Sequence, residues 1–512
     1  MKVVSIFNHV LGPVMRGPSS SHTAGAFHIG CMARSILGCV PARAVLTFDP
    51  AGSYAVTYEP QGADRGFAMG LMGKSLTDES FFTSLSDAHS QGLDIEFRVD
   101  RLIGADHPNM TKLELTAPDG GEVLIMAKSI GGGEAVITRI NDIPCHFTGT
   151  SYEIAVSGSN VSGLVSVLGE LTHSVIGNSV QFALNEPLST ELKNRLLDAY
   201  PDAEIFECHP VYFVQKGEPL FSSAEELVAI AEKNGWSLGE IALKHESQLL
   251  GLTEDEVIDE MLRRWDIMAR SVEEGLRLDF EGLTLLPSCA GKIFNAEADG
   301  KLSVRSLHTR AAARALAVMH VDGAMGVVCA APTGGSAGVI PGAILTLIEK
   351  RELSPRQTAL CLLAAGAIGM ILAIRATFAA EVAGCQVEIG ASGAMAAAGI
   401  VESVGGSAKE ACDAAAVGFQ NTMGTVCDLL HGTVEIPCHT RNGAAAASAF
   451  VVADLILGGY PNLIPLDETI DAVYKVGQAM PPELRCTSRG GLAVTPSALA
   501  LTPKCGTCRT CR

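Results

Sequence analysis

The chain has 512 residues, of which 47% are hydrophobic and 18% are charged, a composition typical of a folded globular protein rather than a disordered one. A chain of this length exceeds one compact core, so we expect two or three domains. The formal net charge of −19 disfavours binding to nucleic-acid phosphates or to anionic membrane surfaces. We therefore expect neither nucleic-acid nor membrane partners.

Targeting signals and cysteine usage both favour a cytoplasmic protein. The opening MKVVSIFNHVLGP has no clean apolar segment before its Gly and Pro residues, so we expect no secretory signal. The longest apolar run, at 359–374, is short for a membrane span and rich in Ala and Gly, which predicts a buried core helix. The 15 cysteines are odd in number and irregularly spaced, which indicates reduced thiols rather than a secreted disulfide scaffold.

Residues 1–150 have the pattern of an α/β domain. Alternating or β-branched runs bounded by Gly, Asp or Pro predict strands at 44–48, 94–99, 112–116 and 122–127. Helices are predicted between them, at 65–72 and from residue 78 onward.

Residues 151–219 form a separate small unit in this interpretation. Strands are predicted at 152–156, 179–184 and 204–214, with helices at 161–171 and 190–199. The resulting β-α-β-α-β order resembles an ACT-type regulatory module, although other small α/β sandwiches share it.

From about residue 220 the pattern becomes helical. Three successive capping boxes predict helix starts, and a glycine follows each helix at 235, 251 and 275. The paired residues are Ser223 with Glu226, Ser237 with Glu240, and Thr253 with Glu256. Small residues dominate after 310 and let helices pack closely. The predicted fold class is α+β: an N-terminal α/β domain (1–150), a small ACT-like module (151–219) and an all-helical catalytic domain (220–512).

Three internal cysteines stand out, because Cys385, Cys427 and Cys438 each lie near Gly or Pro at breaks between helical segments. Irregular backbone at such breaks allows thiolates to converge on a metal cluster. Their spacing matches no standard zinc or ferredoxin pattern, so spacing alone leaves a metal site and scattered core thiols both open. Other cysteines lie in apolar contexts and are predicted to be inert core residues: Cys31, Cys39, Cys329, Cys361 and Cys412.

The C-terminal sequence CGTCRTCR places Cys505, Cys508 and Cys511 in a C-x2-C-x2-C pattern. Three interpretations remain open: a polar end whose thiols oxidise casually, a tail that supplies a metal ligand, or an independent cluster.

Several motifs together resemble one family, the iron–sulfur-dependent L-serine dehydratases, in a single-chain form with a β domain followed by an α domain. GPSSSHTAG (17–25), DHPN (106–109) and SIGGG (129–133) are similar to motifs of the β domain. APTGGSAGVIPG (331–342), the three cysteines, IPCHTRN (436–442) and LRCTSRGGLAVTP (484–496) are similar to the α domain. The resemblance covers nearly the whole chain and is weakest at 151–219.

This resemblance implies a lyase with a [4Fe–4S] cluster that converts L-serine to pyruvate and ammonia, in cytoplasmic amino-acid catabolism and gluconeogenesis. It implies that Cys385, Cys427 and Cys438 bind iron, and that one of the tail cysteines can cap the fourth iron. An iron with an open position takes charge from the departing hydroxyl, so no pyridoxal-phosphate lysine is needed. A small-molecule amino-acid substrate and a homodimer are the expected partners.

His22 has the best claim to act as a catalytic acid–base or substrate-orienting group, since it lies among hydroxyl residues in a loop bounded by Gly and Pro. Candidate substrate-binding residues offer hydroxyls, backbone N–H groups, a cation or an amide. These are Ser20, Ser21, Thr23, Thr333, Gly335, Arg441 and Asn442. Each has a structural alternative, such as a helix cap, a tight turn or a helix-end charge.

One position departs from the family pattern, because Gln61 stands in GSYAVTYEPQGAD where the family has a histidine that is a favoured base. Glutamine cannot act as a base. The base is then His22 or another histidine such as His439, or the substrate differs from L-serine. Two alternatives stay open: the same chemistry on another β-substituted amino acid, and a non-catalytic iron–sulfur or ligand sensor.

Overall fold

The computed structural model describes residues 2–158, 161–169 and 171–503 and has two compact units. One unit, here called the helical unit, combines residues 1–20 with 217–512, and the other, the sheet unit, spans 21–216. Sheets in the N-terminal part and helices in the C-terminal part confirm the predicted α+β class. The division into three domains at 150 and 219 stays a prediction.

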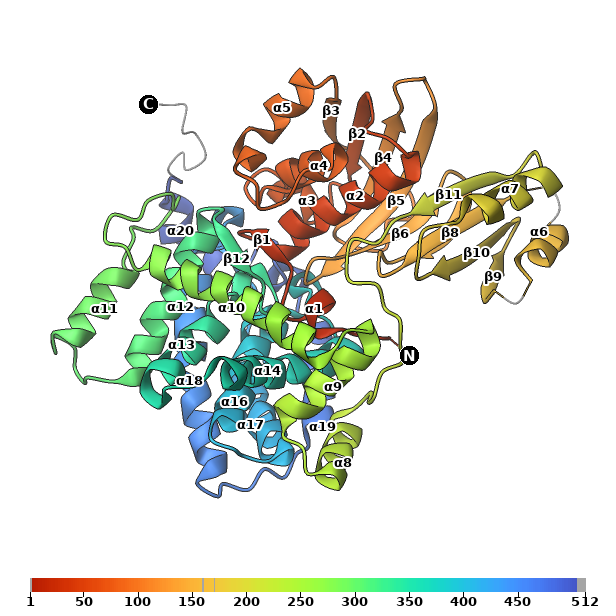
Figure 1. Cartoon of the computed structure of the whole chain (residues 1–512). Coiled ribbons are helices and arrows are strands. Elements are labelled where there is room, and N and C mark those ends of the chain that lie inside the picture. The colour runs from red at the N-terminus through yellow and green to blue at the C-terminus, as the bar shows by residue number, and fades with distance from the viewer. Residues whose placement is uncertain (1, 159–160, 170, 504–512) are drawn as a thin grey trace. The chain divides into compact units, whose positions relative to one another are not determined.

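The sheet unit contains a six-stranded sheet with the order β3-β2-β4-β5-β6-β7. Strand β2 runs parallel to β3, and the other neighbours are antiparallel. Helix α2 packs on α4 and against β5 and β6 (Figure 1). The strands are β2 (Arg43–Phe48), β3 (Asp94–Val99), β4 (Met110–Thr116), β5 (Glu122–Gly131), β6 (Glu134–Ile140) and β7 (Ile143–Phe147). The helices are α2 (Gly25–Leu37), α3 (Tyr54–Thr57), α4 (Ala63–Met72) and α5 (Ser84–Ser90).

A smaller antiparallel sheet, with the order β11-β8-β10-β9, belongs to the same unit. Its elements are β8 (Tyr152–Ser157), α6 (Val161–Leu168), β9 (His173–Ile176), β10 (Ser179–Leu184), α7 (Thr190–Ala199) and β11 (Glu204–Cys208). Strand β9, which was not predicted, forms a hairpin with β10 through Gly177 at φ +60°. The strand predicted at 204–214 ends at Cys208, shortly before Pro210, which has no N–H for a ladder.

The three predicted helix starts in the helical unit are present, as α8 (Ala224–Asn234), α9 (Leu238–Leu250) and α10 (Glu254–Gly275). Ser237 and Thr253 form reciprocal capping boxes with Glu240 and Glu256. At α8 only half of the box forms, because the Glu226 carboxylate accepts hydrogen bonds from the N–H and hydroxyl of the preceding Ser222.

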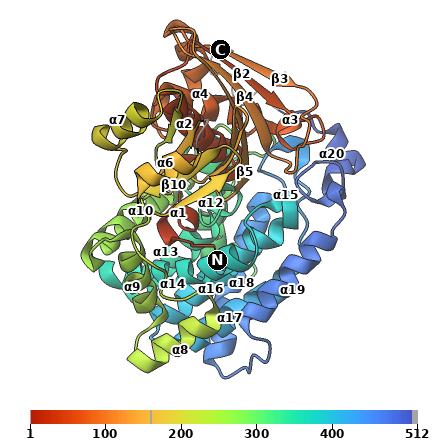
Figure 2. The same ribbon diagram turned by 90° about the vertical axis from the view of Figure 1, so that its right-hand side faces the viewer.

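Helices α14 and α16 lie in the interior of the helical unit, with neighbouring helices around them (Figure 2). Helix α14 is long and apolar enough to cross a membrane, but 83% of its most apolar window is buried within the protein, which confirms the predicted core helix. Two short strands, β1 (Val14–Arg16) and β12 (Val327–Cys329), pair antiparallel. The remaining helices are α1 (Ile6–His9), α11 (Ala290–Ala298), α12 (Leu307–Gly323), α13 (Val339–Arg351), α14 (Pro355–Arg375), α15 (Ala380–Ala383), α16 (Ile389–Ser403), α17 (Ala408–Thr422), α18 (Cys438–Leu457), α19 (Leu466–Ala479) and α20 (Pro496–Ala500).

Candidate metal centre

Each of the three predicted cysteine ligands lies at an irregular point of the backbone of the helical unit. Cys385 begins a short 3-10 turn, η4 (Cys385–Val387), directly after Gly384. Gly384 has φ +77°, and a Cβ there would lie 2.8 Å from the Thr425 carbonyl oxygen, so this position requires glycine. Cys427 lies in the non-helical segment after α17, and Cys438 is the first residue of α18.

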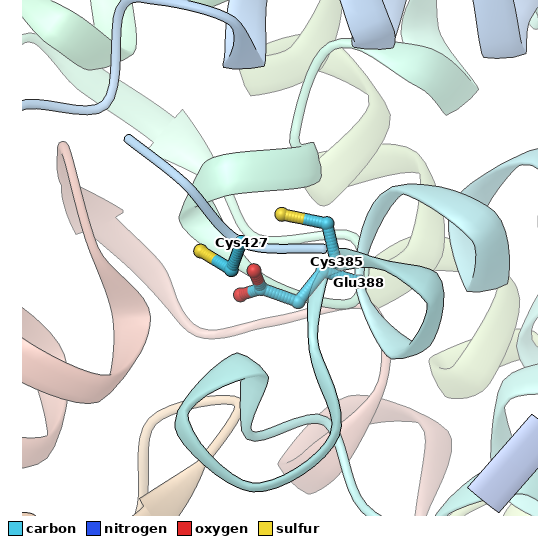
Figure 3. Close-up of side chains that lie close together, drawn as sticks. All are labelled: Cys385, Glu388 and Cys427. Carbon is cyan, nitrogen blue, oxygen red and sulfur yellow. The ribbon is translucent and has the colours of Figure 1, made fainter. Parts of the chain in front are cut away.

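Cys385 and Cys427 come together with a residue that the sequence analysis did not select, Glu388. Their ligand atoms all lie within 4.8 Å of one another, and both thiols are buried (Figure 3). The carboxyl pKa of Glu388 is raised to about 8 by burial and by the charge of Glu381, against a hydrogen bond from Thr333 that lowers it. Cys438 is buried beside this group, where the charges of Cys385 and Glu388 act on its thiol.

A fourth buried thiol, Cys486, also belongs to this neighbourhood, although the sequence analysis gave it no role. The Cys427 N–H donates to the Leu484 carbonyl at 2.9 Å, and the Cys486 N–H donates to the Cys427 carbonyl at 3.0 Å. The Cys427 thiol forms hydrogen bonds with the thiols of Cys385 and Cys486. The LRCTSRGG motif draws attention to Cys486 in the sequence, but nothing in the motif indicates which distant cysteine Cys486 contacts.

Burial keeps these thiols protonated unless a metal replaces the proton. The pKa of Cys385 is raised by its hydrogen bond to Cys427 and by burial, and the pKa of Cys438 is raised chiefly by burial. The hydrogen bond with Cys427 lowers the pKa of Cys486, but burial together with the charges of Glu381, Glu388 and Cys385 raises it to about 11. Buried thiols that meet chiefly one another are the soft donor set preferred by iron–sulfur clusters, so the residues fit such a group.

The predicted residue Arg441 lies beside the thiols and supplies positive charge there. Its guanidinium pairs with Asp428 at 3.0 Å and donates to the Val426 carbonyl at 2.8 Å. Its charge lowers the thiol pKa values of Cys385 and Cys438. Arg441 is therefore held by the segment that carries Cys427, with its cation available to compensate thiolate charge.

The tight turn predicted at 333–335 also lies at this place in the fold. Thr333 hydrogen-bonds with Glu388, as stated above. Asn442 is fully buried, donates to the Gly335 carbonyl at 2.8 Å and accepts from the Gly338 N–H at 3.2 Å. Its amide thus ties the turn to the helix that begins with Cys438. A Cβ on Gly334 would lie 3.2 Å from the Ser20 nitrogen, which places the predicted residue Ser20 against the same turn.

The other predicted N-terminal residues belong to the sheet unit, where they form a buried polar cluster. His22 is fully buried, its Nε2 lies 3.0 Å from the Ser53 hydroxyl, and its ring packs edge-on against Tyr54. The Tyr54 hydroxyl donates to the Ser21 carbonyl at 3.2 Å. Thr23 donates to the carbonyl of Gln61 at 2.6 Å, so the residue that replaces the family histidine lies beside this turn.

The histidines near Cys438 have different surroundings. His439 is buried with its ring centroid 5.4 Å from that of His320, and its pKa is lowered to about 3 by burial and by the charge of His320. His431 Nε2 lies 2.9 Å from the Ala498 carbonyl oxygen, a contact that holds this ring against the backbone after the LRCTSRGG motif. The sequence analysis also missed Asp322, a buried carboxyl whose pKa is raised well above its usual range by burial and by Glu388.

The cysteines of the C-terminal pattern, Cys505, Cys508 and Cys511, lie outside the described residues. Their three interpretations stay predictions.

Comparison with known proteins shows to which family the region that carries these thiols is similar. Residues 233–493, which carry the thiols, match the family model described as serine dehydratase alpha chain. The chain is 36% identical over 289 residues to the probable L-serine dehydratase alpha chain of Bacillus subtilis, covering 56% of this chain and 95% of that protein. It is 28% identical over 513 residues to L-serine dehydratase 2 of Escherichia coli, covering 93% of this chain and 96% of that protein.

A second protein of Escherichia coli, L-serine dehydratase 1, is 34% identical over 284 residues, covering 54% of this chain and 62% of that protein. The prediction of a serine dehydratase-type lyase is thereby confirmed at the level of the family. The chain belongs to the serine dehydratase alpha chain family.

Proposed function

We propose that this chain converts L-serine to pyruvate and ammonia with a [4Fe–4S] cluster held by Cys385, Cys427 and Cys438. The observation that carries the proposal is the buried group of two thiols and the Glu388 carboxyl within 4.8 Å, inside the region that matches the family. A cluster bound there would supply a Lewis-acidic iron for the departing hydroxyl. Loss of water from serine leaves an aminoacrylate, which tautomerises and reacts with water to give pyruvate and ammonia.

The side chains around the thiols suit an amino-acid substrate. Glu388 offers a carboxyl that can receive the substrate ammonium or the α-proton, and Thr333 orients it by a hydrogen bond. The turn at Gly335 offers backbone N–H groups to a carboxylate. Arg441 compensates negative charge beside Cys385. Asn442 positions this turn rather than serving as a free amide.

We propose His22 as the catalytic acid–base residue, with Ser20, Ser21 and Thr23 as groups that bind the substrate. The contact between His22 Nε2 and the Ser53 hydroxyl holds the ring in place, as a proton-transferring histidine needs. His22→Gln should lower turnover on the order of 10²–10⁴-fold without changing the iron content. Unchanged turnover would remove His22 from the mechanism.

The cluster itself is tested by anaerobic purification, followed by iron and sulfide analysis and a pyruvate assay with L-serine. A brown protein that forms pyruvate is expected, and Cys427→Ser should lose both properties. Cys412→Ser removes a comparably buried thiol from α17 and should retain both. A colourless wild-type protein with intact thiols after anaerobic reconstitution would refute the cluster.

Gln61 is the observation that favours the alternative substrate, because it removes the expected histidine from the turn at Thr23. Initial rates with L-serine, L-threonine and L-cysteine, at matched concentrations, distinguish the candidates. The highest kcat/KM for 2-oxo acid formation with L-serine supports the proposal, and a higher kcat/KM with another of these amino acids supports the alternative. A cluster without turnover of any of them supports a sensor.

We also propose a homodimer in the cytoplasm. Light scattering of the anaerobic holoenzyme should give twice the chain mass, and a monomer mass would refute the dimer.

A further inference from the structure

We propose that Cys486 is the fourth protein ligand of the cluster and occupies the remaining iron in the resting enzyme. The inference rests on the proposed function, because it needs the cluster to be present. It assigns the fourth position to the thiol of the LRCTSRGG motif rather than to a cysteine of the C-terminal pattern.

The backbone holds Cys486 directly beside an expected ligand. Cys427 forms a parallel bridge with Arg485, in which the Cys427 N–H donates to the Leu484 carbonyl at 2.9 Å and the Cys486 N–H donates to the Cys427 carbonyl at 3.0 Å. The Arg485 guanidinium donates to the Val382 carbonyl at 3.1 Å, which ties the same segment to the helix before Cys385. The segment that carries Cys486 is therefore anchored to two of the three elements that bear ligands.

The residues after Cys486 keep the segment in an unusual conformation. Cys486 and Ser488 have φ values of +59° and +54°, which cost about 1–2 kcal/mol for residues with a side chain. The Ser488 hydroxyl donates to the Leu429 carbonyl at 2.8 Å and accepts from the Gly432 N–H at 3.2 Å. These contacts hold the turn against the loop that follows Cys427, so the thiol is positioned by the fold.

The thiol of Cys486 meets the other sulfur atoms rather than solvent. The residue is 6% exposed, and its thiol forms a hydrogen bond with the Cys427 thiol, which also forms one with the Cys385 thiol. Four thiolates around a cluster are the common ligand set of [4Fe–4S] proteins. Glu388, the other group within reach, is a harder oxygen donor that iron–sulfur clusters use less readily.

The test compares cluster stability in four holoenzymes: the wild type, Cys486→Ser, Cys412→Ser and a triple variant with serine at 505, 508 and 511. Each is reconstituted anaerobically and then mildly oxidised, and the EPR signal of a three-iron cluster is followed over time. A cluster without its fourth thiolate loses that iron readily, so Cys486→Ser should give the signal on the order of tenfold faster than the wild type. Cys412→Ser and the triple variant should resemble the wild type. The opposite result would overturn the inference: if the three-iron signal appears faster in the triple variant and at the wild-type rate in Cys486→Ser, the fourth ligand is a tail cysteine.

A second measurement uses the unmodified chain, in case Cys486→Ser folds poorly. Anaerobic alkylation followed by peptide mass spectrometry should label Cys486 slowly in the holoenzyme and markedly faster after iron is removed by a chelator. Cys412, which is equally buried, should be labelled at the same rate in both states. Equal labelling rates of Cys486 in both states would refute the inference. The proposed function would still stand if the wild type is brown and active. Absence of iron in the wild type would refute both.

Discussion

Replacing Glu435 with glutamine should loosen the polypeptide that leads into Cys438. Glu435 is 1% exposed and accepts four hydrogen bonds. One oxygen accepts from the Thr284 N–H and hydroxyl, both at 2.6 Å, and the other accepts from the N–H groups of Leu285 at 3.0 Å and Leu286 at 2.8 Å. The carboxylate therefore clamps the loop at 284–286 to the first turn of α18, where the His439 N–H donates to the Glu435 carbonyl at 3.0 Å.

A glutamine keeps only one of the two acceptor oxygens, and its NH₂ group faces backbone donors. If the NH₂ group faces Leu285 and Leu286, two donors lose their partner, at about 1–2 kcal/mol each for a half-buried loop. If the NH₂ group faces Thr284, the Thr284 hydroxyl can rotate and accept a hydrogen bond from it, and only the Thr284 N–H loses its acceptor. The second orientation costs less, and loss of the negative charge weakens the remaining bonds. We expect a total of about 2 kcal/mol.

Urea unfolding followed by tryptophan fluorescence measures this effect selectively, because Trp236 and Trp265 both lie in the helical unit and are the two tryptophans of the chain. The midpoint for Glu435→Gln should fall, and the iron retained per chain should fall with it. Glu410→Gln is the matched control, since Glu410 accepts from the N–H and hydroxyl of Ser407 at an exposed helix start. Equal midpoints for the two variants would refute the clamp.

Three further outcomes follow from the structure. Gly384→Ala places a Cβ 2.8 Å from the Thr425 carbonyl at φ +77°, so we expect an iron content well below that of the wild type, measured by metal analysis; full retention would contradict the steric argument. Asn442→Ala leaves the Gly338 N–H without its acceptor, and should raise KM for serine more than it lowers the unfolding midpoint. Burial raises the pKa of Glu153 to about 7, above its unfolded value near 4.3. Its contribution to stability is therefore fully present below pH ~4.3 and is lost as the pH rises through about 7. Hydrogen exchange of β8 peptides, corrected for intrinsic rates, should show weaker protection at pH 8 than at pH 5.5, a difference that Glu153→Gln reduces.

Much of the secondary structure is determined by local sequence, because its causes act within a few residues. The starts of α9 and α10 follow from Ser237 and Thr253, whose hydroxyls satisfy N–H groups three residues later. Strand β3 and helix α7 have the predicted bounds, since apolar periodicity and turn residues mark both ends. Strand β9 escaped prediction because it is short and its partly exposed side chains give little alternation.

The candidate site also contains residues that the sequence indicates and residues that only the tertiary structure reveals. Cys385, Cys427 and Cys438 could be selected from the sequence because they lie at helix breaks within motifs that resemble a family. Cys486 and Glu388 could not, because their roles depend on contacts with residues that are distant along the chain or on another segment. A parallel bridge brings Cys486 to Cys427, and burial among charged neighbours raises the pKa of Glu388. The sequence by itself therefore determined the family, the fold class and three thiols, whereas the tertiary structure decided which further side chains share their buried, low-dielectric environment.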